Sequence, residues 1–152
     1  MKYLLLLLLP CWTEAATYLN WGFGFDRADR GSYSDVQNYA FGLRLSNMFY
    51  VEGGGWKDST DYIGAEGSLY TSAGLVLNLD LTEKYVSYSI GPAFITRPDT
   101  LLGSHYQVYH KLSIGFRENS KRIGLFVKHF SNAGAFGARN AGRNFFGLEI
   151  GF

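Results

Sequence analysis

A histidine and a serine near the C-terminal end of the chain have the spacing of a catalytic base and its nucleophile. His129 and Ser131 end an alternating stretch, residues 122–132, in which Ile123, Leu125 and Val127 share their face. In a β-strand the side chains at positions i and i+2 point to the same face and lie roughly 7 Å apart. The imidazole could therefore take the proton of the Ser131 hydroxyl, the first requirement for an activated nucleophile. The apolar residues on the same face predict that the substrate is apolar as well.

The rest of the chain supplies strands that could position this pair. Its 152 residues suffice for one complete barrel or sandwich, and its many aromatic residues and glycines, with only 3 prolines, favour β structure. Eight segments alternate between apolar and polar residues: Thr17–Asp26, Ser34–Ser46, Met48–Lys57, Leu69–Leu81, Tyr85–Arg97, His105–Glu118, Arg122–Asn132 and Asn144–Phe152. Short and long connections alternate between them, which is typical of outer-membrane barrels. The sequence predicts an all-β fold: an eight-stranded antiparallel transmembrane β-barrel over residues 16–152, with both termini on the periplasmic side.

The two faces of these segments differ in chemistry, and this decides which face meets lipid. One face is apolar and bulky, with residues such as Leu19, Trp21, Phe41 and Leu77, whereas the other carries Asn20, Arg44, Glu52, Lys111, Lys128 and Glu149. Eight strands enclose a lumen only wide enough for side chains. A soluble lipocalin would need the bulky apolar set inside, whereas charges of both signs can pair within a small lumen. We therefore expect the apolar face to meet lipid and Lys128 to pair with Glu149 inside.

Residues 1–15 are interpreted as a signal peptide that is removed after Sec export. Lys2 precedes an apolar core, Leu4–Leu9, and Thr13-Glu14-Ala15 offers the small residues that signal peptidase reads, with cleavage after Ala15 or, alternatively, Ala16. The apolar run is far shorter than the ~20 residues that a membrane-spanning helix needs. A lipoprotein signal at Cys11 is disfavoured because Pro10 stands where such signals have a small residue.

The C-terminal strand supports a location in the bacterial outer membrane. It alternates and ends on Phe152, which resembles the terminal signal by which outer-membrane proteins are recognised for insertion. Aromatic residues near other strand ends are expected to form interfacial girdles: Tyr18, Tyr50, Trp56, Tyr85 and Tyr106. The formal net charge of +1 excludes a polyanion-binding surface, so no nucleic acid partner is expected. No residue spacing indicates a metal site or a cofactor.

The last quarter of the chain contains His129-Phe130-Ser131-Asn132-Ala133-Gly134, followed by Arg139-Asn140-Ala141-Gly142-Arg143-Asn144 and a last strand that ends in Phe. In these motifs it resembles the outer-membrane lipid A 3-O-deacylase (PagL-type) family. The resemblance implies a carboxylic ester hydrolase that removes an ester-linked acyl chain from lipid A of lipopolysaccharide in the outer leaflet, surrounded by outer-membrane lipids. A homodimer is implied by the resemblance only.

The resemblance also implies a role for each site residue. Ser131 matches the nucleophile and His129 the base, while Asn132, with the backbone amides of Ala133 and Gly134, matches the oxyanion-stabilising region. The family has a glutamate at the start of the last strand, where this chain has Asn144. Alternation places Asn144 on the outer face beside His129, where its carbonyl could orient the imidazole without supplying the charge of a carboxylate.

Other candidates are weaker. Arg139 and Arg143 stand in the last long connection, and arginine suits the phosphates of lipopolysaccharide. His105 and His110 have no comparable partner in the sequence and are expected to be structural or rim residues. Two other functions stay open: a non-enzymatic structural or adhesion barrel with a vestigial site, and an acyl-ester hydrolase that acts on phospholipids.

Overall fold

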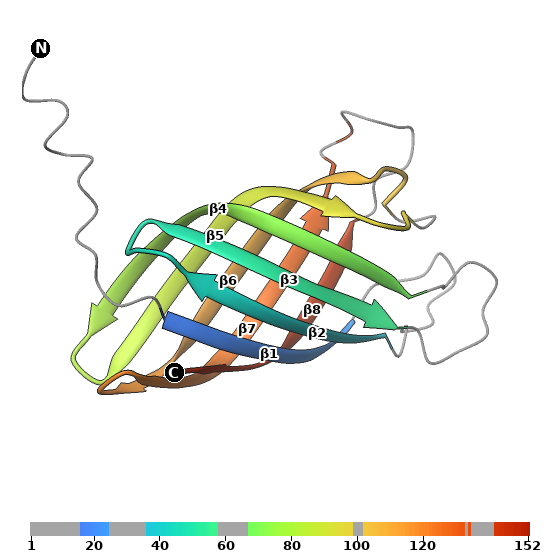
Figure 1. Ribbon diagram of the computed structural model, residues 1–152. Helices are drawn as coiled ribbons and strands as arrows, with labels where there is room; N and C mark the ends of the chain where they lie inside the picture. The colour runs from blue at the N-terminus through green and yellow to red at the C-terminus, as the bar shows by residue number, and fades with distance from the viewer. Residues whose placement is uncertain (1–15, 25–35, 58–66, 99–101, 133, 135–141) are drawn as a thin grey trace, which may run out of the picture.

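The chain forms a closed, eight-stranded antiparallel barrel in which each strand pairs with its sequence neighbours and the last pairs with the first (Figure 1). The computed structural model describes residues 16–24, 36–57, 67–98, 102–132, 134 and 142–152. The strands are β1 (Ala16–Gly24), β2 (Gln37–Arg44), β3 (Phe49–Lys57), β4 (Ser68–Leu81), β5 (Lys84–Ile95), β6 (Tyr106–Glu118), β7 (Lys121–Ser131) and β8 (Arg143–Gly151). The predicted fold class is confirmed, and each predicted segment overlaps one strand.

The two ends of the barrel differ. Short turns join β2 to β3, β4 to β5 and β6 to β7 at one end, where the chain also enters β1 and leaves β8 (Figure 1). The longer connections, between residues 24 and 37, 57 and 68, 95 and 106, and 131 and 143, belong to the opposite end, which we call the long-loop end. In the β6–β7 turn Asn119 has a φ of 54°, a left-handed conformation that asparagine tolerates better than most residues. The predicted signal peptide, residues 1–15, lies outside the described residues.

Alternation along the strands sends bulky apolar side chains outward. The outer wall includes Leu77, which is 66 % exposed, together with Leu19, Trp21, Phe41, Leu125 and Phe146. Closure of the sheet leaves no unpaired edge, which a surrounding lipid phase could not satisfy. The outward placement of the apolar face is as predicted. The described part of the chain contains no helix long and apolar enough to cross a membrane.

The lumen is filled by a connected set of buried charges. Glu52 on β3 accepts hydrogen bonds from Lys128 Nζ at 2.8 Å and from Lys111 Nζ at 3.0 Å. Lys111 also pairs with Glu149 at 2.9 Å, and Arg44 Nη2 lies 3.6 Å from Glu149. The expected ion pair between Lys128 and Glu149 is therefore wrong, because Lys128 pairs with Glu52 and Glu149 pairs with Lys111. Both Lys128 and Glu149 point inward, as predicted. The stagger of the strands places Glu52 of β3, and not Glu149 of β8, within reach of Lys128 in the lumen.

Most of the expected aromatic girdle also faces the lumen. Tyr18, Tyr50, Trp56 and Tyr85 are buried, and only Tyr106 of that set is exposed. Each buried one alternates with outward neighbours on its strand, so its ring fills the barrel interior instead of the lipid interface. Near the long-loop end, Trp56 packs against Tyr70, Phe130 and Phe145 with ring centroids 5.5 to 5.8 Å apart.

The buried charges predict a large loss of stability when their central acid is removed. Glu52→Ala leaves the two lysines that contact Glu52 with less negative charge around them, and we expect the free energy of unfolding to fall by about 3–5 kcal/mol. Urea titration of the folded barrel in detergent measures this change. Glu83→Ala, in the exposed β4–β5 turn, is the matched control and should not move the midpoint. Equal midpoints for Glu52→Ala and wild type would contradict a structural role for the network.

Candidate active site

His129 and Asn144 lie directly opposite each other on β7 and β8, close to the long-loop end of the barrel. The Nδ1 atom of His129 is 2.8 Å from the Asn144 side-chain oxygen, and both residues are partly exposed on the outer wall. A carbonyl oxygen can only accept, so the imidazole donates from Nδ1 and its other nitrogen, Nε2, is left unprotonated in the neutral ring. This tautomer is the one that a general base needs.

Ser131 is the last residue of β7 and shares the outer face with His129. Lys128 and Phe130, which alternate with this pair, are buried, whereas His129 and Ser131 are partly exposed. Within the described part of the chain, neither the Ser131 hydroxyl nor His129 Nε2 has a hydrogen-bond partner. Both groups are thus available to each other and to a substrate, since catalytic hydrogen bonds are often long before a substrate binds.

Gly142 supports the imidazole from the chain segment that leads into β8. Its φ is +75°, and a Cβ added there would lie 2.5 Å from His129 Cε1 and 3.0 Å from the carbonyl oxygen of Phe130. Two features disfavour any side chain at this position: the left-handed backbone conformation, and the imidazole of His129, which occupies the space of a Cβ. Gly142 was not among the predicted site residues, although it stands in the motif Arg139–Asn144 that carries the resemblance.

Gly142→Ala is therefore expected to lower turnover at this site much more than it lowers stability. The new methyl group must displace the ring of His129, and a misplacement of about 1 Å in a catalytic group can cost about 100-fold in rate. Turnover by the purified variant measures this effect, and urea unfolding measures its stability in parallel. Gly134→Ala is the matched control, since Gly134 also has a positive φ but nothing lies within 4 Å of its added Cβ. Equal activities in the two variants would show that Gly142 does not support His129 during catalysis.

The strand that carries the pair is anchored from inside the barrel. Phe130, between His129 and Ser131, is fully buried and packs on Tyr70 at 4.8 Å and Tyr109 at 5.3 Å between ring centroids. Phe145, next to Asn144, is also fully buried and packs on Trp56 at 5.5 Å. Rigid aromatic packing on the inner face thus sets the positions of the three outward side chains.

The side chain of Asn132 does not point toward Ser131. It is buried, its amide nitrogen donates to the carbonyl oxygen of Leu102 at 3.0 Å, and its oxygen accepts from the Gly134 backbone N–H at 2.9 Å. Alternation after Ser131 turns Asn132 inward, where it closes the turn that follows β7. The side chain of Asn132 and the amide of Gly134, both predicted as oxyanion donors, therefore have structural partners instead. Ala133 lies outside the described residues.

Arg143 likewise points to the inside of the barrel wall. It precedes the outward Asn144, its side chain is buried, and its guanidinium carbon lies 5.9 Å above the ring of Trp56. Arg143, which was predicted to lie beside the site, thus faces away from Asn144, because adjacent residues of a strand face opposite sides. Arg139 lies outside the described residues.

Two outward polar residues extend the site on its other side. His110 on β6 lies directly opposite His129, with ring centroids 6.1 Å apart, and its Nδ1 is 2.7 Å from the hydroxyl of Tyr88 on β5. Asn144, His129, His110 and Tyr88 thus cross four adjacent strands of an apolar wall. The sequence could not indicate this arrangement because it depends on the register between β6 and β7.

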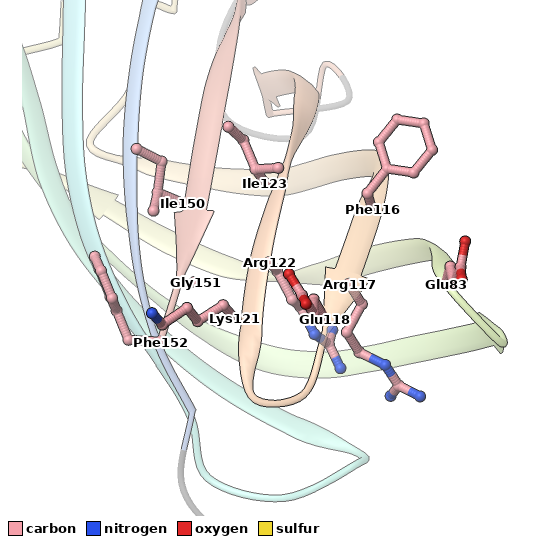
Figure 2. A pocket seen from close by; sticks show the side chains of 10 residues that line it. All are labelled: Glu83, Phe116, Arg117, Glu118, Lys121, Arg122, Ile123, Ile150, Gly151 and Phe152. Atoms are coloured by element: carbon pink, nitrogen blue, oxygen red, sulfur yellow. The ribbon is translucent and has the colours of Figure 1, made fainter.

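A separate pocket lies at the other end of the barrel. It is bordered by the β6–β7 turn and the end of β8, with Arg117, Lys121 and Arg122 near the turn and Ile123 and Ile150 along the wall (Figure 2). Its volume is about 580 Å³. Because Ser131 lies at the opposite end of β7, this pocket is not part of the candidate active site. Among the described residues, no three His, Cys, Asp or Glu side chains are grouped so as to hold a metal ion.

The closed barrel and its apolar outer wall define a membrane-spanning β-barrel. A model of the lipid A 3-O-deacylase (PagL) family matches residues 2–152, so the chain belongs to that family. Among solved structures, the chain is similar to one described as the outer membrane enzyme PagL, with a TM-score of 0.65 and 19% sequence identity. That similarity covers 91% of this chain and 99% of the other. The comparison with curated proteins gives no significant match.

Proposed function

We propose that this protein is a serine-type lipid A 3-O-deacylase that cleaves its substrate in the outer leaflet of the outer membrane. The observation that carries the proposal is the 2.8 Å hydrogen bond from His129 Nδ1 to Asn144, on the same wall as Ser131. The family supports lipid A as the substrate. The long-loop end, where the pair lies, is the extracellular end of bacterial barrels with this pattern of connections.

In the proposed reaction His129 first acts as a base. Its Nε2 takes the hydroxyl proton of Ser131 while the serine oxygen forms a bond to the acyl carbonyl carbon. The tetrahedral intermediate then expels the sugar oxygen, which receives the proton from His129. Water attacks the resulting acyl-enzyme with the same histidine as base, and the fatty acid leaves.

The oxyanion of the intermediate needs hydrogen-bond donors on the outer side of the wall. We infer that they come from the segment between Ser131 and Gly142, with the backbone N–H of Ala133 as the first candidate. Arg139 in the same segment is the candidate contact to a lipid A phosphate. The Asn132 side chain and the Gly134 amide do not take this role, because the Asn132 amide nitrogen donates to Leu102 in the β5–β6 connection and the Gly134 N–H donates to Asn132.

Mass spectrometry of lipid A from cells that express the chain tests the proposal. We expect a species lighter by one acyl chain, absent when Ser131→Ala is expressed at equal folded amount. Fatty acid released from phospholipids, with lipid A intact, would instead support the phospholipid hydrolase that the sequence left open. Intact lipid A and phospholipids with a folded barrel would favour the vestigial site.

A further inference from the structure

The outward pair formed by His110 and Tyr88 is not used by the proposed mechanism. Both side chains are partly exposed on the outer wall, with Tyr88 Oη 2.7 Å from His110 Nδ1. Their outward neighbours along β6, Leu112 and Ile114, are 45 % and 50 % exposed. Polar groups on an apolar, lipid-facing wall are unfavourable unless they are hydrogen-bonded.

The hydrogen bond between the two residues satisfies only one edge of the imidazole. Within the described residues, His110 Nε2 has no hydrogen-bond partner. That nitrogen is a donor if Tyr88 donates to Nδ1, and an acceptor if Nδ1 donates to Tyr88. A hydroxyl group, which both donates and accepts, matches either tautomer.

The position of His110 relates it to the acyl chain of the substrate. The register pairs Val108 with Ser131 and His110 with His129, so His110 lies two residue pairs farther from the long-loop end than the nucleophile. An ester whose carbonyl meets Ser131 must direct its acyl chain along the wall, away from the long loops and into the hydrocarbon. The first carbons of a chain that runs along β6 and β7 then pass His110.

We propose that His110, oriented by Tyr88, is a specificity-determining residue that binds a hydroxyl group on the acyl chain within a few bonds of the scissile ester. This inference rests on the proposed function, because it takes Ser131 as the point where the ester carbonyl binds. It assigns to the enzyme a preference for hydroxylated acyl chains over plain ones. His129 is less suited to this role, since its Nδ1 is held by Asn144 and its Nε2 serves the nucleophile.

Two synthetic glucosamine esters in detergent micelles test this, one with a β-hydroxyacyl chain and one with a plain chain of equal length. The measured quantity is the ratio of their kcat/KM values with purified, folded protein. We expect wild type to favour the hydroxylated ester, and His110→Phe, which keeps a ring of similar size, to lower the ratio about tenfold. Tyr88→Phe should lower it in the same direction by a smaller factor, and it covers the case in which His110→Phe does not fold.

The matched control is His105→Phe. His105 is also exposed near the long-loop end, but its Nδ1 bonds the carbonyl oxygen of Ile95 and its ring stacks on Phe94. In His105→Phe the ratio of the two kcat/KM values should equal that of wild type. Equal cleavage of both esters by wild type, or an unchanged ratio in His110→Phe, would overturn the assignment of His110 and leave the proposed function standing. Cleavage of neither ester by wild type would overturn both proposals.

Discussion

Ser131→Ala is expected to abolish deacylation, with a loss of at least about 10⁴-fold in kcat, because removal of a serine nucleophile leaves only binding and oxyanion stabilisation. The barrel should stay folded, since Ser131 faces outward and its hydroxyl has no hydrogen bond to another described residue. Fatty acid release in detergent measures the rate, and the mobility shift on heating reports the folded state. Ser120→Ala, in the exposed turn at the other end of the barrel, is the matched control.

The histidine variant tests whether the pair acts as a unit. His129→Ala should lose a similar factor, and the double variant should be no worse than either single one, because residues of one catalytic unit are strongly non-additive. Multiplication of the two losses in the double variant would mean that His129 and Ser131 act separately. Wild-type turnover in Ser131→Ala would rule out the serine mechanism.

Asn144→Ala is expected to lower turnover by about one to three powers of ten. The variant removes the acceptor that holds His129 Nδ1 at 2.8 Å, so the ring loses its orientation and its base tautomer. Replacing the carboxylate of a classical triad by an amide costs about 10⁴-fold, and here the geometry is built around the amide from the start, so a smaller loss is expected. Leu148→Ala is the control, since Leu148 faces outward on the same strand without touching His129.

The reverse change tests whether charge limits the rate. Asn144→Glu introduces a carboxylate that could stabilise the imidazolium formed when Ser131 loses its proton, and turnover should rise if that carboxylate stays ionised at the barrel wall. A rate at or below wild type would show that the neutral partner is the better one at this position. If neither substitution changed turnover, Asn144 would not orient His129 during catalysis.

The sequence by itself determined the features that depend on one strand at a time. Alternation predicted eight strands, an apolar outer wall and the outward placement of His129 and Ser131, because side-chain direction in a strand has a period of two. The same rule also places Asn132 and Arg143 inward, away from the oxyanion role that the resemblance implied for Asn132 and from the phosphate contact expected of Arg143. The girdle expected from aromatic residues near strand ends failed for the same reason, as for Tyr18 beside the outward Leu19.

Only the tertiary structure decided which residues meet across strands. The register of β7 against β8 brings Asn144 to His129, and that of β6 against β7 brings His110 to the other side of the ring. The partners of the buried lysines depend on the curvature of the closed barrel, which places Glu52 within reach of Lys111 and Lys128, 59 and 76 positions away in the chain. Periodicity predicts the face of a residue, but hydrogen bonds between strands and the closure of the barrel determine its neighbours on that face.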